Sequence, residues 1–142
     1  MSNERTEAPA PQGDYVPAVC HDGVIYTAGM TPRRAGALVW TGVVGDTLSA
    51  EQARAAAGLA ALNALSAARA AQPGPGALRC LRMTVFIACA RGFTALSAVA
   101  DGASAVLAAE LGVDALPARS AIGVRALPSG VPVEVELTAA VL

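Results

Sequence analysis

The segment from Ser49 to Gly76 constrains the fold most, because the sequence marks both of its ends as those of a helix. Ser49 and Gln52 are the pair that forms a capping box at a helix N-terminus. The residues up to about Gln72 are nearly all helix formers, and Pro73–Gly76 ends the helix because proline cannot continue it. Its many alanines permit other backbones to approach closely. The bulky residues that we expect to form most of its buried stripe are Leu59, Leu62 and Leu65.

Short apolar runs before this helix predict strands. Residues 15–20 and 24–29 are two such runs separated by His21–Gly23, and Asp-Gly between apolar runs favours a β-hairpin. Residues 31–36 then predict a loop, and residues 37–41 predict a further short strand.

Strand and helix patterns alternate after the helix. Residues 81–90 are rich in Val, Phe and Ile and predict a strand that is buried on most of its surface. Residues 95–111 predict a second helix that ends at Gly112, a fitting C-cap. Two strands, residues 121–124 and 131–137, then follow on either side of a proline turn. The expected core positions of the second helix are Leu96, Val99, Val106 and Leu107.

The order of these elements predicts an α+β fold. Both helices would cover one face of a mixed sheet. In the last strand Glu134 and Glu136 alternate with apolar residues. The uncovered sheet face would be apolar or partly charged, and self-association usually covers such a face. The 142 residues suit one domain. We expect a flexible N-terminal tail over residues 1–12 and a single domain over residues 13–142.

The composition argues against two classes of protein. The net charge is −1, and the ten basic residues are scattered arginines rather than the clustered charge of a nucleic-acid-binding surface. No apolar run of the sequence suits a bilayer span, and no signal peptide is visible. We therefore expect a cytoplasmic protein with neither nucleic acid nor a membrane as partner.

The cysteines and the one histidine offer little chemistry. Cys20, Cys80 and Cys89 match no zinc pattern and lie in apolar segments, as free thiols of the reducing cytosol do. The single histidine, His21, excludes a histidine-based metal site, and its neighbour Cys20 points to the opposite face of a strand. We therefore expect no metal, no disulfide and no Cys/His nucleophile.

The clearest candidate site joins Arg119 to Glu134, fifteen residues later. If the two last strands pair with each other, the guanidinium and the carboxylate come together in the sheet. Arginine binds a carboxylate through two parallel hydrogen bonds, and a nearby glutamate holds or activates a water. An ordinary ion pair between strands explains the same spacing and is the commoner case when spacing alone is considered.

A further set of segments is informative through its order and spacing. The segments are Gly13–Ala18, Ile25–Pro32, Gln52, Ala61–Leu65, Val85–Ile87, Pro117–Val124, Ala126–Pro128 and Val133–Glu136. Together they resemble the RidA/YjgF family, long labelled endoribonuclease L-PSP, and the resemblance extends roughly from residue 13 to residue 140. Residues 38–42, 59–63 and 101–104 look more like a distinct subgroup than like the best-studied imine deaminases of the family.

The resemblance implies a chorismate-mutase-like α+β fold and a homotrimer. Three sheets would form a central barrel with the helices outside and three ligand clefts between the subunits. The best-known activity of the family is hydrolysis of 2-imino or 2-enamino acids to 2-keto acids and ammonia, with no metal or organic cofactor. The implied ligand is a small carboxylate-bearing imine, enamine or keto acid.

The resemblance also implies roles for individual residues. Arg119 matches the family arginine that binds the substrate carboxylate, and Glu134 matches the glutamate that positions the attacking water. Tyr15 matches a tyrosine that lines the cleft, and Gly29 matches a glycine whose backbone approaches the ligand. Ala121 stands where the deaminases often have a cysteine whose main chain contacts the ligand. Structural alternatives stay open: Tyr15 as a packing residue and Glu134 as a polar lining of the barrel.

Three positions depart from the family pattern. Ala28 replaces a serine and Met30 replaces a glutamine of a Ser-Gly-Gln motif, which removes a hydroxyl and adds apolar volume at the substrate site. Asp101 stands where an asparagine is common, and near Arg119 it would compete with a substrate carboxylate. Asp101 as a turn or cap residue, and Trp40 as a core or interface residue, are the simpler interpretations.

Three functions therefore stay open. The first is an enamine or imine deaminase in which Arg119 anchors the carboxylate and Glu134 is the general base. The second is a non-catalytic trimer that binds a small metabolite or a partner enzyme, which Ala28 and Met30 favour. The third is a specialised biosynthetic catalyst for another imine or carbonyl intermediate. A ribonuclease has the least support, because the chain lacks a basic stripe and a histidine pair and has few aromatic residues for stacking.

Overall fold

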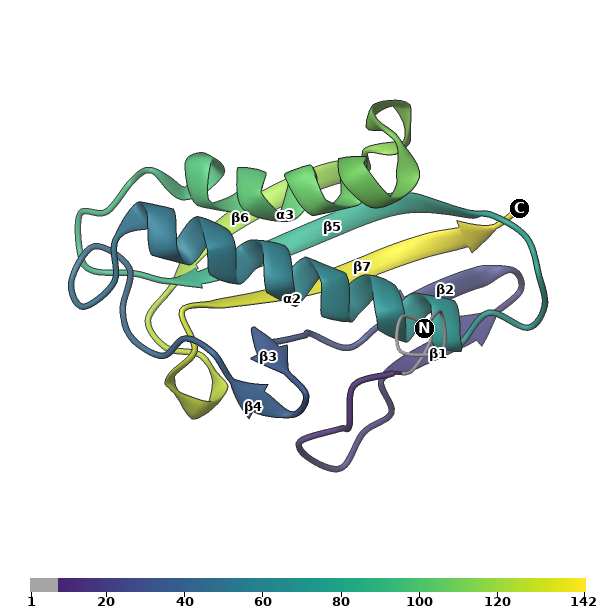
Figure 1. The fold of residues 1–142 in the computed structure, drawn as a ribbon, viewed down its shortest axis with the longest axis horizontal. Coiled ribbons are helices and arrows are strands. Elements are labelled where there is room, and N and C mark those ends of the chain that lie inside the picture. The colour runs from purple at the N-terminus through teal and green to yellow at the C-terminus, as the bar shows by residue number, and fades with distance from the viewer. Residues whose placement is uncertain (1–7) are drawn as a thin grey trace.

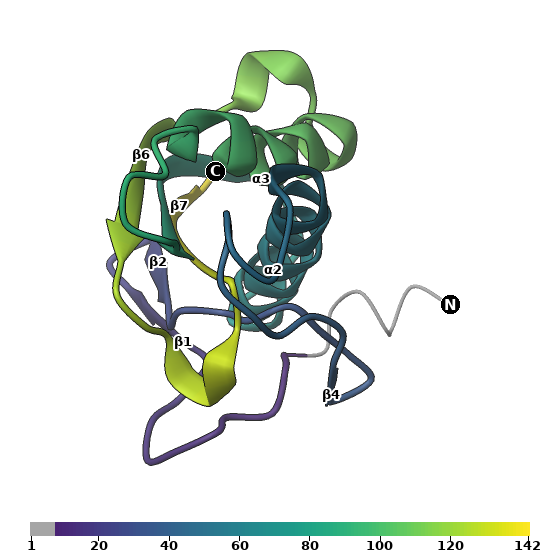
Figure 2. The ribbon, with the colours of Figure 1, turned by 90° about the vertical axis from the view of Figure 1, so that its left-hand side faces the viewer.

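The computed structural model describes residues 8–142 and confirms the α+β architecture: two helices cover one face of a five-stranded sheet (Figures 1 and 2). The sheet order is β1-β2-β7-β5-β6, in which β5 and β6 are parallel and the other neighbours are antiparallel. The elements are β1 (Ala18–His21), β2 (Val24–Thr27), β3 (Arg33–Arg34), β4 (Ala37–Leu38), α2 (Ala50–Ala70), β5 (Leu78–Ala88), α3 (Leu96–Leu111), η1 (Val113–Ala115), β6 (Ala118–Val124), η2 (Pro128–Gly130) and β7 (Val133–Val141).

Helix α2 begins with the predicted capping box. The Gln52 backbone N–H donates to Ser49 Oγ at 3.1 Å, and the Ser49 backbone N–H donates to Gln52 Oε1 at 2.9 Å. The predicted buried stripe is wrong in part: Leu65 is fully buried, whereas Leu59 and Leu62 are partly exposed. Small side chains make the contact instead, because α2 lies close to both the sheet and α3. They are Ala53, Ala56, Ala57, Ala60, Ala61, Ala64, Ala67 and Ala68.

Helices α2 and α3 approach each other at two glycines. A Cβ atom at Gly102 would overlap the backbone oxygen of Arg54, and one at Gly58 would lie 3.1 Å from a methyl carbon of Val106. Of the core positions expected in α3, Val99 and Leu107 are buried and the other two are partly buried. Glycine is therefore required at position 102, where the α3 backbone meets that of α2.

Two tight hairpins precede α2. The predicted Asp-Gly turn joins β1 to β2, with Asp22 and Gly23 at φ 49° and 75°. The predicted loop at residues 31–36 contains a second hairpin instead, because Ala35 and Gly36 also take positive φ and turn β3 back onto β4.

The two faces of the sheet differ as the alternation in β7 predicts. Val133, Val135 and Leu137 are buried beneath the helices, whereas Glu134 and Glu136 lie on the opposite face. No helix among residues 8–142 covers that opposite face, which we call the open sheet face (Figure 2). Its exposed apolar side chains include Val19, Tyr26 and Ile122. Neither helix is long and apolar enough to cross a membrane.

The predicted pairing of the last two strands is wrong. Strand β5 lies between β6 and β7, because the β5-α3-β6 crossover makes β6 the parallel partner of β5 and leaves the other edge of β5 for β7. Arg119 is in register with Met83, which is buried beneath the helices, and Glu134 is in register with Phe86 on the open sheet face. Arg119 and Glu134 of one chain therefore project from opposite faces of the sheet.

Candidate functional site

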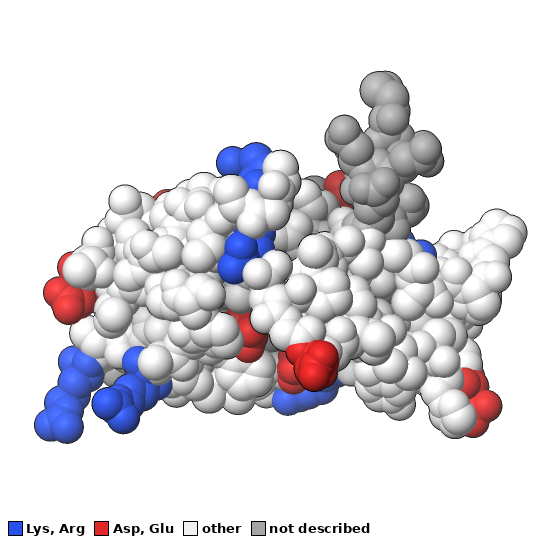
Figure 3. Space-filling view, turned by 90° about the horizontal axis from the view of Figure 1, so that it is seen from below, with Lys and Arg blue, Asp and Glu red and all other residues white. Residues whose placement is uncertain are grey.

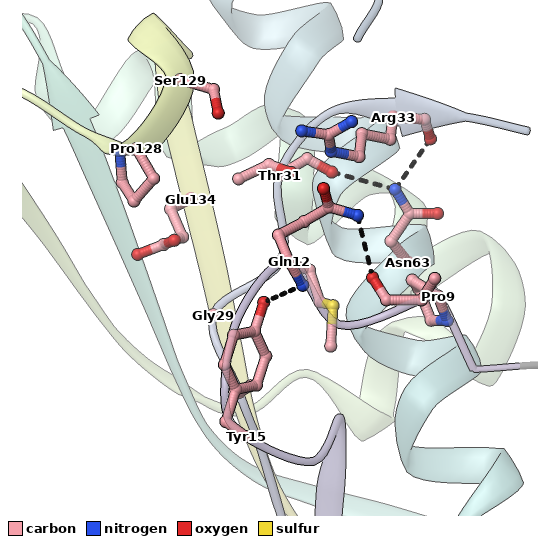
Figure 4. Close-up of a pocket in the computed structure, with 13 residues that line it drawn as sticks. Pro9, Gln12, Tyr15, Gly29, Thr31, Arg33, Asn63, Pro128, Ser129 and Glu134 are labelled. Atoms are coloured by element: carbon pink, nitrogen blue, oxygen red, sulfur yellow. Dashed lines mark hydrogen bonds between the residues drawn. The ribbon is translucent and has the colours of Figure 1, made fainter. Parts of the chain in front are cut away.

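The candidate site is a pocket of about 330 Å³ where the N-terminal segment and the connection from β2 to β3 meet η2 and β7 (Figure 4). Of the residues singled out in the sequence, Tyr15, Gly29, Met30 and Glu134 line it, together with Ala28. Of the predicted tail, residues 1–7 lie outside the described residues, and Pro9, Ala10 and Gln12 form part of the pocket wall.

Tyr15 stands at one wall of the pocket (Figure 4). The Gln12 backbone N–H donates to the Tyr15 hydroxyl oxygen at 3.0 Å, and the Gln12 side chain donates to the Ala10 carbonyl oxygen at 3.1 Å. In this hydrogen bond the Tyr15 hydroxyl is the acceptor, so its own proton remains available. A ligand in the pocket can therefore accept a hydrogen bond from Tyr15.

The Glu134 carboxylate lies directly over Gly29. A Cβ atom at Gly29 would lie 2.6 Å from Glu134 Cδ, so a side chain at this position would displace the carboxylate. The backbone of Met30 holds the two segments together, because its N–H donates to the Val135 oxygen at 2.7 Å and its oxygen accepts from the Val135 N–H at 2.9 Å. The missing side chain of Gly29 therefore makes the space in which Glu134 sits.

Glu134 has the electrostatics of a proton acceptor. Partial burial raises the pKa of its carboxyl, and the like charge of Glu136 on the same strand face raises it further. No arginine or histidine among residues 8–142 forms an ion pair with it. A carboxylate without a cationic partner and with a raised pKa takes up a proton more readily than an exposed glutamate.

Arg119 lies outside this pocket and is bound to α3. Its Nη1 donates to Asp101 Oδ1 at 2.8 Å and to Ser104 Oγ at 2.9 Å, and its Nη2 donates to Ser97 Oγ at 2.7 Å. Asp101 is thus close to Arg119, as the sequence suggested. The neighbouring strand residue Ala121 packs partly buried against the core. Within one chain, these three predicted residues form a group separate from the Glu134 pocket.

Asn63 and Arg33 are two of the pocket residues that were not predicted as site residues from the sequence. Asn63 on α2 donates through Nδ2 to the backbone oxygens of Thr31 and Arg33, both at 2.9 Å. Arg33 itself lines the pocket and donates through Nη1 to the Gly36 oxygen at 2.8 Å. A polar asparagine among the alanines of α2 is the signal that could have identified this wall.

The remaining candidates for chemistry lie elsewhere. The three cysteines are free thiols, and burial raises the pKa of Cys80. Within residues 8–142, no three histidine, cysteine, aspartate or glutamate side chains gather in a way that could hold a metal ion. Trp40 packs partly buried against the core, in agreement with a structural role.

A family model described as Endoribonuclease L-PSP matches residues 5–141. The chain belongs to this family. The match confirms the resemblance to RidA/YjgF proteins, for which endoribonuclease L-PSP is the older label, and it covers nearly the whole chain.

The chain is also similar to three individual proteins over most of its length. Protein TCP17 of Trypanosoma cruzi is 34% identical over 131 residues, which cover 91% of this chain and 82% of TCP17. The crystal structure of Atu1372 from Agrobacterium tumefaciens, a protein of unknown function, is 30% identical, with a TM-score of 0.86 over 93% of this chain and 85% of Atu1372. Escherichia coli TdcF with bound serine is 25% identical, with a TM-score of 0.66 over 94% of this chain and 92% of TdcF. The fold is more similar to that of Atu1372 than to that of TdcF.

Proposed function

We propose that the protein hydrolyses small 2-imino or 2-enamino acids to 2-keto acids and ammonia. The observation that carries this proposal is the half-buried Glu134 above Gly29, which has no cationic partner among residues 8–142 and a raised pKa. Membership of the family supports the same reaction. Bound serine in TdcF supports a small ligand with a carboxylate.

In the proposed reaction Glu134 acts as general base. It accepts a proton from a water molecule as the water oxygen bonds to the imine carbon. The same proton then passes to the substrate nitrogen, which gives a carbinolamine. Glu134 next accepts the proton of the carbinolamine hydroxyl and passes it to the nitrogen, and the carbon–nitrogen bond breaks as the carbonyl forms, so that ammonia leaves with the 2-keto acid. A raised pKa suits a group that takes up and returns a proton twice in each cycle. Tyr15 and the backbone at Gly29 would position the substrate beside it.

The anchor of the α-carboxylate would come from a neighbouring copy of the chain. Arg119 matches the family anchor but lies on the opposite sheet face from Glu134 in its own chain. A homotrimer with clefts between subunits would bring Arg119 of one copy to Glu134 of another. In this arrangement Asp101 orients the guanidinium, and the strand at Ala121 forms part of the cleft wall.

A second candidate function is a non-catalytic trimer that binds the same class of small carboxylate. The apolar lining of the pocket favours this function, because Ala28 and the buried Met30 stand where the family motif has a serine and a glutamine. A specialised catalyst for another imine or carbonyl intermediate remains a third.

A ribonuclease gains no support from the face in Figure 3, where basic side chains lie in separate groups with acidic ones between them. The free cysteines agree with the cytoplasmic location that we propose.

An ammonia-release assay with 2-aminoacrylate generated in situ tests the proposal. We expect Glu134→Gln to slow release by at least about a hundredfold, the usual contribution of a general base. Calorimetry should show that this variant still binds a 2-keto acid, because glutamine keeps the shape of the side chain. Glu136→Gln is the matched control: it lies on the same strand and face but does not line the pocket, and it removes only the smaller of the two effects on the pKa of Glu134, so we expect it to slow release far less than Glu134→Gln does.

The outcomes separate the functions. Full activity of Glu134→Gln would show that this carboxylate is not the base. A wild-type protein that binds 2-keto acids but releases no ammonia from any small imino acid would favour the binding trimer instead.

A further inference from the structure

Arg33 presents an incompletely bonded guanidinium to the pocket. Its Nη1 donates to the Gly36 oxygen at 2.8 Å, but its Nε is buried and has no hydrogen-bond partner among residues 8–142. A buried cationic donor without a partner is unfavourable and uncommon in native proteins. Arg33 lines the same pocket as Glu134, so a small turn of the guanidinium toward a ligand in that pocket would give Nε the missing acceptor.

The geometry of the unused donors suits a carboxylate. With Nη1 bound to Gly36, the guanidinium edge formed by Nε and Nη2 carries no hydrogen bond to the described residues. These two donors are parallel and match the two oxygens of a carboxylate. Figure 4 shows the guanidinium pointing into the pocket toward the side where Ser129 lies.

The fold holds Arg33 in place from two sides. Asn63 of α2 donates to the backbone oxygens of Thr31 and Arg33, and the β3-β4 turn presents the Gly36 oxygen to Nη1. A guanidinium that is already oriented loses little freedom when it binds an anion.

No acidic side chain among residues 8–142 neutralises Arg33. The arginine ion pairs of this part of the chain join Arg69 to Glu110 and Arg119 to Asp101, and Glu134 is not within ion-pair distance of Arg33 although both line the pocket. The pocket therefore holds a cation and a carboxylate apart, which leaves room for an anionic group at one side and a water near the other.

We propose that Arg33 binds a second carboxylate and that the substrate is a dicarboxylic imino or enamino acid. The inference rests on the proposed function, because it assigns the substrate class of the same pocket. The α-carboxylate is bound by Arg119 of the neighbouring copy, the imine carbon lies at Glu134, and the distal carboxylate is bound by Nε and Nη2 of Arg33. The product is then a 2-keto dicarboxylic acid.

Calorimetric binding of two 2-keto acids tests the inference without requiring turnover. We expect the wild-type protein to bind 2-oxoglutarate at least about tenfold more tightly than 2-oxobutyrate, since a charge-assisted contact is worth that much or more. Arg33→Gln should weaken 2-oxoglutarate binding by about ten- to a hundredfold and leave 2-oxobutyrate within about threefold. Arg33→Lys should restore only part of the loss, because an ammonium lacks the planar pair of donors.

Arg34→Gln is the matched control. Arg34 is the next residue, carries the same charge, is exposed and does not line the pocket, so this variant should bind both acids as the wild type does. Thermal melting checks that each variant folds. If Arg33→Gln does not fold, binding of 2-oxoglutarate by Arg33→Lys tests the inference in its place.

Failure of this inference and failure of the proposed function look different. Equal binding of the two acids by the wild type, or unchanged 2-oxoglutarate binding by the Arg33 variants, would overturn the second anchor even if ammonia is released. A preference for 2-oxoglutarate that Arg33→Gln removes, without ammonia release from any imino acid, would support the anchor and overturn the deaminase.

Discussion

Glu134 owes its chemical character to its immediate neighbours. Gly29 leaves the space that its carboxylate occupies, and Glu136 contributes a like charge on the same face. Burial removes part of the water that would stabilise the charged form, and this is the larger of the two effects on its pKa. The raised pKa of Glu134 therefore affects both the stability of the folded protein and the chemistry of the pocket.

The first prediction concerns the pH dependence of stability at Glu134. Its pKa is raised in the folded protein, so the folded state holds this proton at pH values where the unfolded state has lost it. The contribution to stability is complete below the unfolded pKa and is lost as pH rises through the folded pKa. Glu134→Gln removes this loss, so its melting temperature should exceed that of the wild type at about pH 8 and approach it at about pH 4. Calorimetric melting across that range measures the gap, and a gap independent of pH would contradict the prediction.

The contacts among α2, α3 and β6 depend on small side chains and on a few hydrogen bonds between side chains. Alanines fill the face of α2 that meets the core, and two glycines let α2 and α3 approach. Arg119 joins β6 to α3 through Asp101, Ser104 and Ser97. Single substitutions at these contacts should therefore change how well whole elements fit together.

Gly102→Ala should destabilise the protein by about 3 kcal/mol, although alanine is the better helix former, because its Cβ would overlap the Arg54 backbone oxygen. Gly74→Ala is the control, since no atom lies within 4 Å of a Cβ there, and we expect it to be nearly neutral. Urea denaturation of both variants gives the free energies of unfolding. A Gly102→Ala variant as stable as the wild type would mean that the two helices can separate without loss.

Arg119→Ala should lower the free energy of unfolding by about 1–2 kcal/mol in the absence of ligand, because it removes charged hydrogen bonds between β6 and α3. Arg125→Ala, which removes an exposed arginine shortly after β6, should change stability by less than about 0.5 kcal/mol. Denaturant titration compares the two. Equal effects would leave Arg119 with no role in joining the strand to the helix, and only its proposed role as a ligand anchor.

On the scale of the whole molecule, the open sheet face requires an explanation. Ile122 is 42% exposed on this face and Tyr26 is 53% exposed, and Glu134 and Glu136 lie on the same face. A face of this kind suits contact with further copies of the chain. The same association would bring Arg119 and Glu134 of different copies together, so the proposed assembly and the proposed site depend on each other.

Light scattering after size exclusion should therefore give about three chain masses for the wild type. Ile122→Glu should give a smaller species, because it places a charge on the open sheet face without a partner. Val113→Glu is the control: Val113 is 70% exposed and lies in η1, away from that face, so the variant should keep the wild-type mass. A monomeric wild type, or an Ile122→Glu variant of unchanged mass, would contradict the trimer.

The sequence by itself determined the two helices, the first hairpin turn and the two faces of the last strand. The capping box at Ser49, the Asp-Gly turn at Asp22 and the end of α2 before Pro73 lie where the sequence predicts them. The alternation that buries Val133 and places Glu134 on the open sheet face is also as predicted. These features depend on neighbouring residues and on side-chain periodicity, which a sequence displays directly.

Only the tertiary structure decided which elements meet. The sequence suggested that β6 pairs with β7, but β5 lies between them, and Arg119 and Glu134 consequently project from opposite faces. It also could not show that Arg33 reaches the pocket, because Asn63, thirty residues further along the chain, holds that segment in place. The order of the strands and hydrogen bonds such as those of Asn63 depend on contacts between distant segments of the chain. The free energy of these contacts depends on the whole packed structure, so no local sequence pattern reveals them.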